Sequence, residues 1–251
     1  MLSLPLVLSG LALSLATPPA SASEPIDPRD GGELIALMHD RYADTWYRTL
    51  TFVQRTTLSD GSVQTWYEAI ATPGRLRIDV APLDSMHALL FRNDSIYEFR
   101  AGKLVRSDAQ IHPLMVLGFD VYAQPADETV RKLTTLGFDL SKLHETTWQG
   151  RATYVVGAEQ GDSSSRQFWI DKERLYFVRS IEPSRRDPAA RVDTRFEKYI
   201  PMAGGWLETE VLFLVDGAQR GKEEYSDPQA NVTLDPAIFE AGKWTAPGWV
   251  R

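Results

Sequence analysis

The sequence has no cysteine among its 251 residues and only four histidines. The missing cysteine excludes a disulfide scaffold, a thiolate metal site, a cysteine nucleophile and a lipid-modified N-terminal cysteine. The histidines show none of the spacings by which histidines ligate a metal, so we expect no metal site and no cofactor. They are His39, His87, His112 and His144. An ordinary packed core must therefore hold the chain together.

Positive charge is also in short supply, because the formal net charge is −7 at pH 7. An acidic balance argues against nucleic acid as a partner and against adhesion to anionic lipid. We therefore expect neither a nucleic-acid-binding protein nor a protein that lies on the surface of an anionic membrane.

Long apolar runs are confined to the start of the chain. The first 22 residues carry no charged side chain, and residues 4–16 are nearly all apolar. That run is too short to cross a bilayer core roughly 30 Å thick. Ala20-Ser21-Ala22 has the A-x-A arrangement that a signal peptidase cleaves. We interpret residues 1–22 as a secretory signal peptide and residues 23–32 as a linker, with an N-terminal membrane anchor as the alternative.

What the chain does contain is alternation, most clearly in Gly74–Val80 (GRLRIDV). Three apolar residues fall on one side of this extended segment and three charged residues on the other, which predicts antiparallel sheet with one dry and one wet face. Strand patterns bounded by turn residues occur at 49–57, 63–72, 75–80, 86–92, 95–100 and 103–107. They resume at 145–149, 151–159, 166–171, 175–182, 191–200, 206–216 and 219–226.

Helical periodicity occurs in two places. From Glu33 onward, one stripe of apolar residues predicts an amphipathic helix of about four turns. Within residues 108–144, the run from Pro113 to Tyr122 is apolar nearly all round, so a helix there has to be enclosed. A better-formed helix follows at residues 125–137. We interpret 108–144 as a helical lid or plug inserted into a single domain, residues 33–241, with a frayed tail at residues 242–251.

The number of strands predicts the architecture. A sheet of about eleven strands would be about 50 Å wide if flat, whereas three helices shield only about 30 Å. A sheet this large curls. We therefore predict a mainly β (α+β) fold, an incomplete antiparallel barrel, or half-barrel, with an N-terminal helix and a helical lid. Its interior is either a cavity for a lipophilic ligand or a filled core.

Apolar residues on the dry faces are the candidate ligand-binding positions. The candidates for the wall are Phe52, Leu76, Ile78, Phe91, Phe99, Phe177, Val211 and Phe213. The candidates for the lid are Leu114, Met115, Leu117 and Phe119. Any single one of these positions fits ordinary core better than a ligand site, but the set is the one feature that points to binding.

Only one short segment of the sequence suggests hydrolase activity. Gly161-Asp162-Ser163 is similar to the nucleophile segment of some esterases, but it lies in a polar loop between two strands. No helix follows, as a nucleophile turn requires. The segment therefore reads as a hairpin loop, and we expect a protein that is not an enzyme.

Several segments that together cover nearly all of the chain after residue 22 match a known plan. They are the helix with Leu34, Leu37, Met38 and Tyr42, the segments 49–52, 73–79, 89–97, 113–136 and 168–171, and the late residues Asn231, Leu234, Asp235, Pro236 and Phe239. The plan resembles the periplasmic lipoprotein-carrier superfamily, the LolA/LolB-like half-barrels involved in outer-membrane lipoprotein sorting.

The resemblance implies a fold and a function. The fold is an unclosed antiparallel barrel with helices across its mouth, and its cavity receives acyl chains. The function is that of a soluble, monomeric periplasmic carrier or chaperone for lipid or lipoprotein acyl chains, served by an inner-membrane donor and an outer-membrane acceptor. The alternative is a non-transporting envelope protein of the same fold that senses lipid or regulates a partner, and a hydrolase is the remote one.

Overall fold

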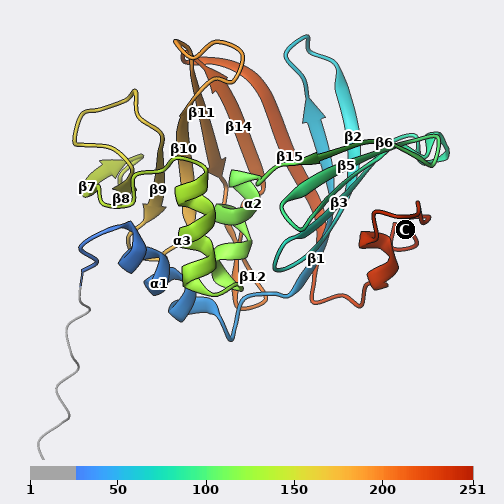
Figure 1. The fold of residues 1–251 in the computed structure, drawn as a ribbon, viewed down its shortest axis with the longest axis horizontal. Helices are drawn as coiled ribbons and strands as arrows, with labels where there is room; N and C mark the ends of the chain where they lie inside the picture. Colours follow the sequence, from blue (N-terminus) through green and yellow to red (C-terminus); the bar gives the residue numbers. More distant parts are fainter. Residues whose placement is uncertain (1–26, 251) are drawn as a thin grey trace, which may run out of the picture.

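The computed structural model describes residues 27–250. The predicted signal peptide and residues 23–26 of the predicted linker lie outside that range. The first six strands follow one another as a meander, as the alternation predicts (Figure 1). They are β1 (Thr49–Thr57), β2 (Val63–Ala71), β3 (Arg75–Val80), β4 (Ala88–Arg92), β5 (Ser95–Arg100) and β6 (Lys103–Ala109). A short 3-10 turn, η1 (Leu83–Ser85), precedes β4.

A second series of strands completes one antiparallel sheet of 13 strands, where the sequence predicted about eleven. They are β7 (Leu143–Trp148), β8 (Arg151–Val156), β9 (Gln167–Asp171), β10 (Phe177–Pro183), β11 (Arg191–Glu197), β14 (Glu210–Val215) and β15 (Ala218–Ala230). A separate hairpin pairs β12 (Ile200–Met202) with β13 (Gly205–Leu207). The two series join where β15 pairs with β1. Within residues 27–250, β6 and β7 each have a single partner strand, so the curved sheet stays open as a half-barrel.

Three helices lie against the concave face, toward the β7–β11 side (Figure 1). Helix α1 (Gly31–Tyr42) begins at Asp30, whose carboxylate accepts a hydrogen bond from the Glu33 amide at 2.9 Å. Helix α3 (Ala126–Thr135) carries acidic residues in its first turn. The apolar run predicted as one helix forms α2 (Pro113–Gly118) and a 3-10 turn, η2 (Asp120–Tyr122). In the described part of the chain, no helix is both long and apolar enough to span a membrane.

The convex face of β2–β5 is covered, which corrects two sequence predictions. Arg77 and Asp79, predicted on the wet face, are only 3% and 2% exposed and form an ion pair of 2.8 Å. The Arg77 guanidinium also donates to the Ile238 carbonyl at 3.0 Å and lies 5.2 Å from the ring centre of Trp249. The C-terminal segment, which includes η3 (Pro236–Phe239), therefore packs on the sheet instead of fraying.

Candidate ligand-binding cavity

A cavity of about 280 Å³ lies between the concave face and α2. Strands β1 to β4 form one wall, β11, β14 and β15 form another, and α2 with Phe119 closes one side. Most of its lining is apolar. The apolar lining residues are Phe52, Trp66, Leu76, Ile78, Leu89, Phe91, Leu114, Met115, Phe119, Phe196 and Phe213. The interior of the half-barrel is thus not filled by its own side chains.

Eight of the twelve predicted residues line this cavity. Those from the wall are Phe52, Leu76, Ile78, Phe91 and Phe213, and those from the lid are Leu114, Met115 and Phe119. Register explains why they meet: Leu76 pairs with Phe91, and Ile78 pairs with Leu89, so their side chains share one face of the sheet.

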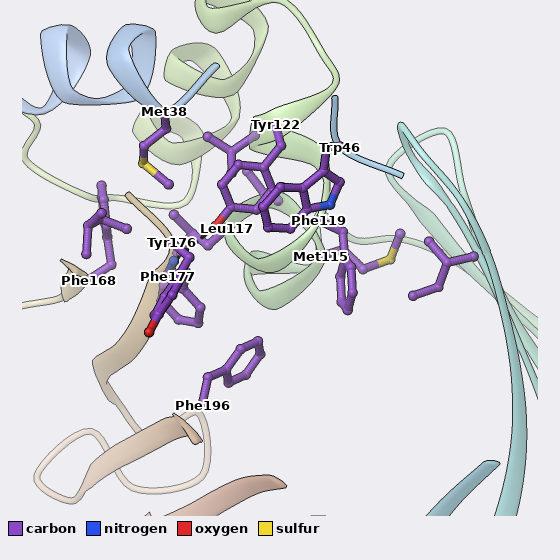
Figure 2. Packing of buried hydrophobic residues seen from close by; sticks show 14 of the residues in the cluster. Met38, Trp46, Met115, Leu117, Phe119, Tyr122, Phe168, Tyr176, Phe177 and Phe196 are labelled. Carbon is purple, nitrogen blue, oxygen red and sulfur yellow. Dashed lines mark hydrogen bonds between the residues drawn. The ribbon is translucent and has the colours of Figure 1, made fainter. Parts of the chain in front are cut away.

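Three predicted residues face the interior but lie behind the cavity. Phe177 is fully buried and meets the ring of Phe196 edge to face, with 4.8 Å between ring centres. Val211 pairs with Phe196 across the sheet and is also fully buried. In Figure 2, Leu117 points toward Phe177, away from the cavity side of α2. These three are core residues that support the cavity wall.

The prediction that Phe99 faces the interior is wrong. Phe99 pairs with Ala88, and both pack against Ile238 and Phe239 on the convex face. Ile96 is the residue of β5 that points into the half-barrel. Segment 95–100 carries apolar side chains on both faces, so alternation alone could not decide which one is inside.

Sequence reasoning missed the polar floor of the cavity. Gln54 from β1, Glu68 from β2, and Glu223 and Tyr225 from β15 all line it. The ring of Tyr225 lies 4.4 Å from that of Phe52, and its hydroxyl donates to Glu223 at 3.1 Å. Strand alternation could have revealed it, because residue 54 lies two positions after Phe52 in β1 and therefore points to the same face of the sheet.

Burial governs the charge of this floor. Burial raises the pKa of Glu223 to about 7, and the hydrogen bond from Tyr225 opposes that rise. Burial also raises the pKa of Glu68 well above its usual range, and the negative charges of Glu223 and Glu208 add to the effect. Glu208, just before β14, is 1% exposed, and burial raises its pKa to about 8. The floor therefore holds protons up to neutral pH.

The predicted lid segment, residues 113–122, comprises α2 and η2, and different contacts hold its two ends. At its start, Pro113 fits the first helical position, and the His112 ring caps the turn by accepting from the Met115 amide at 3.4 Å. Near its C-terminal end, in η2, the Asp120 carboxylate accepts a 2.8 Å hydrogen bond from the Gly74 amide. Gly74 has a φ of +79°, which favours glycine at this turn.

Tyr122 fixes the end of the lid segment further. Its hydroxyl accepts from the Phe177 amide at 3.0 Å, and its ring stacks on Trp46 with 3.7 Å between ring centres (Figure 2). Because η2 is anchored to both halves of the sheet, any movement of the lid has to take place toward the N-terminal end of α2.

Comparisons with known proteins bear on the fold. No protein-family model matches the sequence, and no curated protein matches it significantly. Solved structures do match. A domain from Vibrio parahaemolyticus, described as an outer membrane lipoprotein-sorting protein domain, superimposes with a TM-score of 0.57 at 13% identity, over 84% of this chain and 97% of that one. A DUF1329 family protein from Desulfovibrio piger gives 0.57 at 15% identity, over 84% and 96%.

This chain shares the fold of these two structures. A LolA superfamily protein from Nitrosomonas europaea is also similar, at 12% identity with a TM-score of 0.48, over 82% of this chain and 97% of that one. The likeness to the Vibrio and Desulfovibrio structures confirms the predicted half-barrel architecture. Because their identities to this chain are low, any statement about ligands has to rest on the cavity itself.

A second hollow lies on the convex side of the sheet. It measures about 520 Å³ and separates the β1–β15 pair from the C-terminal segment. Thr51, Asp227, Gln229 and Thr233 contribute polar groups to its lining, and Trp249 borders it. A mixed polar surface of this kind suits water better than an acyl chain.

The loop suspected of hydrolase chemistry is built as a turn. The Ser165 and Ser164 hydroxyls donate hydrogen bonds to the Asp162 carboxylate, and so do the amides of the same two residues, at 3.1 and 2.7 Å. These bonds, those of the hydroxyls first, hold the pKa of the Asp162 carboxyl below its usual value. Ser163 is exposed at the tip of the β8–β9 hairpin. Among residues 27–250, no cluster of three or more acidic or histidine side chains is arranged to hold a metal ion.

Proposed function

We propose that the protein is an exported, periplasmic carrier that shields an acyl chain of a lipid or lipoprotein inside its half-barrel. The observation that carries this proposal is the apolar cavity between the concave face and α2. An inner-membrane donor would load the chain and an outer-membrane acceptor would take it. Binding needs no catalytic group, because removal of apolar surface from water supplies the free energy.

The size of the cavity limits what it holds at rest. A cavity of 150 Å³ accepts one benzene molecule, so about 280 Å³ has room for a short chain only. The nine methylenes of n-decanol contribute about 7 kcal/mol before the cost of association. Longer acyl chains require more room.

Helix α2 supplies that room when its N-terminal end moves. Leu114, Met115 and Phe119 face the cavity, so a chain can replace their contacts with the wall. The anchors of η2 keep the lid attached while the start of α2 swings out. The lid side chains thus occupy part of the site when cargo is absent.

Titration calorimetry with n-decanol tests the binding site, because this probe has one chain and an uncharged head. Phe213→Glu places a carboxylate on the half-buried cavity wall, and we expect its affinity to fall at least tenfold. Leu104→Glu, a change of an exposed apolar residue on β6, is the matched control and should bind as the wild type does. Equal binding by both variants and the wild type would contradict this site.

The firm attachment of η2 favours a second function, that of a lipid sensor that binds a chain without passing it on. Transfer of a labelled lipid between two vesicle populations separates the two functions. A carrier increases the transfer rate in proportion to its concentration. A sensor binds the chain and leaves the transfer rate unchanged.

A further inference from the structure

The polar floor of the cavity contains a carboxyl group without a partner. Glu68 is 5% exposed, lines the cavity, and receives no hydrogen bond from any group in the described part of the chain. A buried carboxyl group without hydrogen bonds is costly, so its retention at this position needs an explanation.

Two further carboxyl groups stand close enough to act on Glu68 electrostatically. They are Glu223, in the same cavity, and Glu208, whose Oε1 atom is buried without a hydrogen-bond partner. Within residues 27–250, no positively charged side chain is among the groups that shift the pKa of these three carboxyl groups. The nearby Lys222 pairs instead with Glu210 and Glu224, at 2.8 Å each.

The other titratable groups that face the floor supply no positive charge at neutral pH. Tyr225 lies beside Glu223 and donates to it. His112 lines the cavity from the start of α2, and burial with the positive charge of Arg185 lowers its pKa to about 4, so its ring is neutral. The inner end of an otherwise apolar cavity is therefore a group of carboxyl oxygens with no positive charge beside it.

We propose that the preferred ligand of this cavity is an amphiphile with an ammonium group, seated against Glu68 and Glu223 with its chain along Leu76, Ile78 and Phe91. This inference rests on the proposed function. An ammonium group has three donors and no acceptor, which matches a floor of carboxyl oxygens. A carboxylate or phosphate head cannot form such an ion pair, and its negative charge opposes ionisation of the same carboxyl groups. The floor therefore selects among lipids that the apolar wall alone would accept equally.

The proposal predicts that binding releases protons. An ammonium group stabilises the charged form of each carboxyl, so the carboxyl groups that hold protons in the empty cavity give them up on binding. Affinity for the ammonium ligand therefore rises with pH through the neutral range. Calorimetric titrations in two buffers of different ionisation enthalpy measure this release, which should be absent for an uncharged head.

Three probes with the same chain separate this inference from the proposed function. They are n-decylammonium, n-decanol and n-decanoate, titrated at pH 7 below their aggregation concentrations. We expect the wild type to bind n-decylammonium at least tenfold more tightly than n-decanol, and n-decanoate most weakly. Equal binding of all three would overturn the inference and leave the proposed function standing, whereas binding of none would overturn the function itself.

Variants of the floor test whether Glu68 and Glu223 cause the preference for n-decylammonium. Glu68→Gln with Glu223→Gln keeps the shape of the floor, and its preference for n-decylammonium over n-decanol should fall to within threefold. Glu224→Gln removes a carboxylate that pairs with Lys222 and Arg55, and it should keep the full preference. Loss of preference in the Glu224 variant, or its retention in the double variant, would contradict the assignment. If the double variant does not fold, the affinities of the wild type for the three probes still test whether the cavity prefers an ammonium group.

Discussion

The two halves of the concave face are packed differently. Over β8–β10, the helices and η2 reach the sheet, and Val156, Phe168 and Phe177 are fully buried there. Over β1–β4, β14 and β15, about 280 Å³ stays empty between the sheet and α2. The same alternation of side chains therefore produces a solid core in one half and a binding cavity in the other.

The difference lies in what the strands place inside. The filled half presents apolar side chains to α1 and η2, and it closes around the stacked rings of Trp46 and Tyr122. The hollow half presents Glu68 and Glu223 among its apolar residues. Carboxyl groups on the floor make close apolar packing unfavourable, since a side chain placed against them would leave them without solvent or partners.

The largest expected effect on stability comes from replacing one phenylalanine in each half. Phe177→Ala in the filled half should lower the free energy of unfolding by about 3–5 kcal/mol, because it removes a packed ring and leaves a new cavity. Phe91→Ala in the hollow half should cost about 2 kcal/mol, since one side of its ring already borders empty space. Urea denaturation measures both. Equal losses would show that the two halves are packed alike.

A second test concerns the buried acid between the halves. The pKa of Glu208 is about 8 in the folded protein and ordinary in the unfolded chain, so the native state binds the extra proton between pH 4.5 and 8. Stability must therefore fall as pH rises through that window. At pH 8.5 the free energy of unfolding of Glu208→Gln should exceed that of the wild type by on the order of 4 kcal/mol, and at pH 4.5 the two should be nearly equal.

The control for this test is Glu224→Gln, an acid whose pKa the neighbouring Lys222 lowers. This variant should not gain stability at high pH. If the Glu208 variant shows the same pH profile as the wild type, the side chain is not held in a low-dielectric site.

The smallest expected effect lies on the opposite face of the sheet. Trp249→Ala removes a ring that lies 5.2 Å from the Arg77 guanidinium and should cost about 1–2 kcal/mol of unfolding free energy. Because this contact is separated from the cavity by the sheet, n-decanol should bind the variant with unchanged affinity. A loss of binding would mean that the convex side contributes to the site.

The sequence predicted what depends on local pattern. Regular alternation located the meander 49–107, and the helical period located α1, because both patterns reflect one buried face. The predicted wet face of β3 was wrong, since Arg77 and Asp79 are covered by residues more than 150 positions later in the chain. No local pattern reveals such a contact.

Sequence alternation placed some residues on the correct face of the sheet and others on the wrong one, for related reasons. Leu76, Ile78 and Phe91 were found because each stands in a strand with a single apolar face. Phe99 was misplaced because its strand is apolar on both faces. Glu68 was missed because the search followed apolar side chains, whereas an acid at an inward position is informative only once the face is known.

Photo-crosslinking with a decyl chain that carries a terminal diazirine tests the cavity most directly. The account predicts one chain attached per protein, with the labelled residues on α2 and the concave strands, Met115 and Ile78 among them. Labelling confined to the convex hollow around residues 248–250, or to the exposed Leu104 and Val105 of β6, would contradict the assignment of the cavity as the binding site.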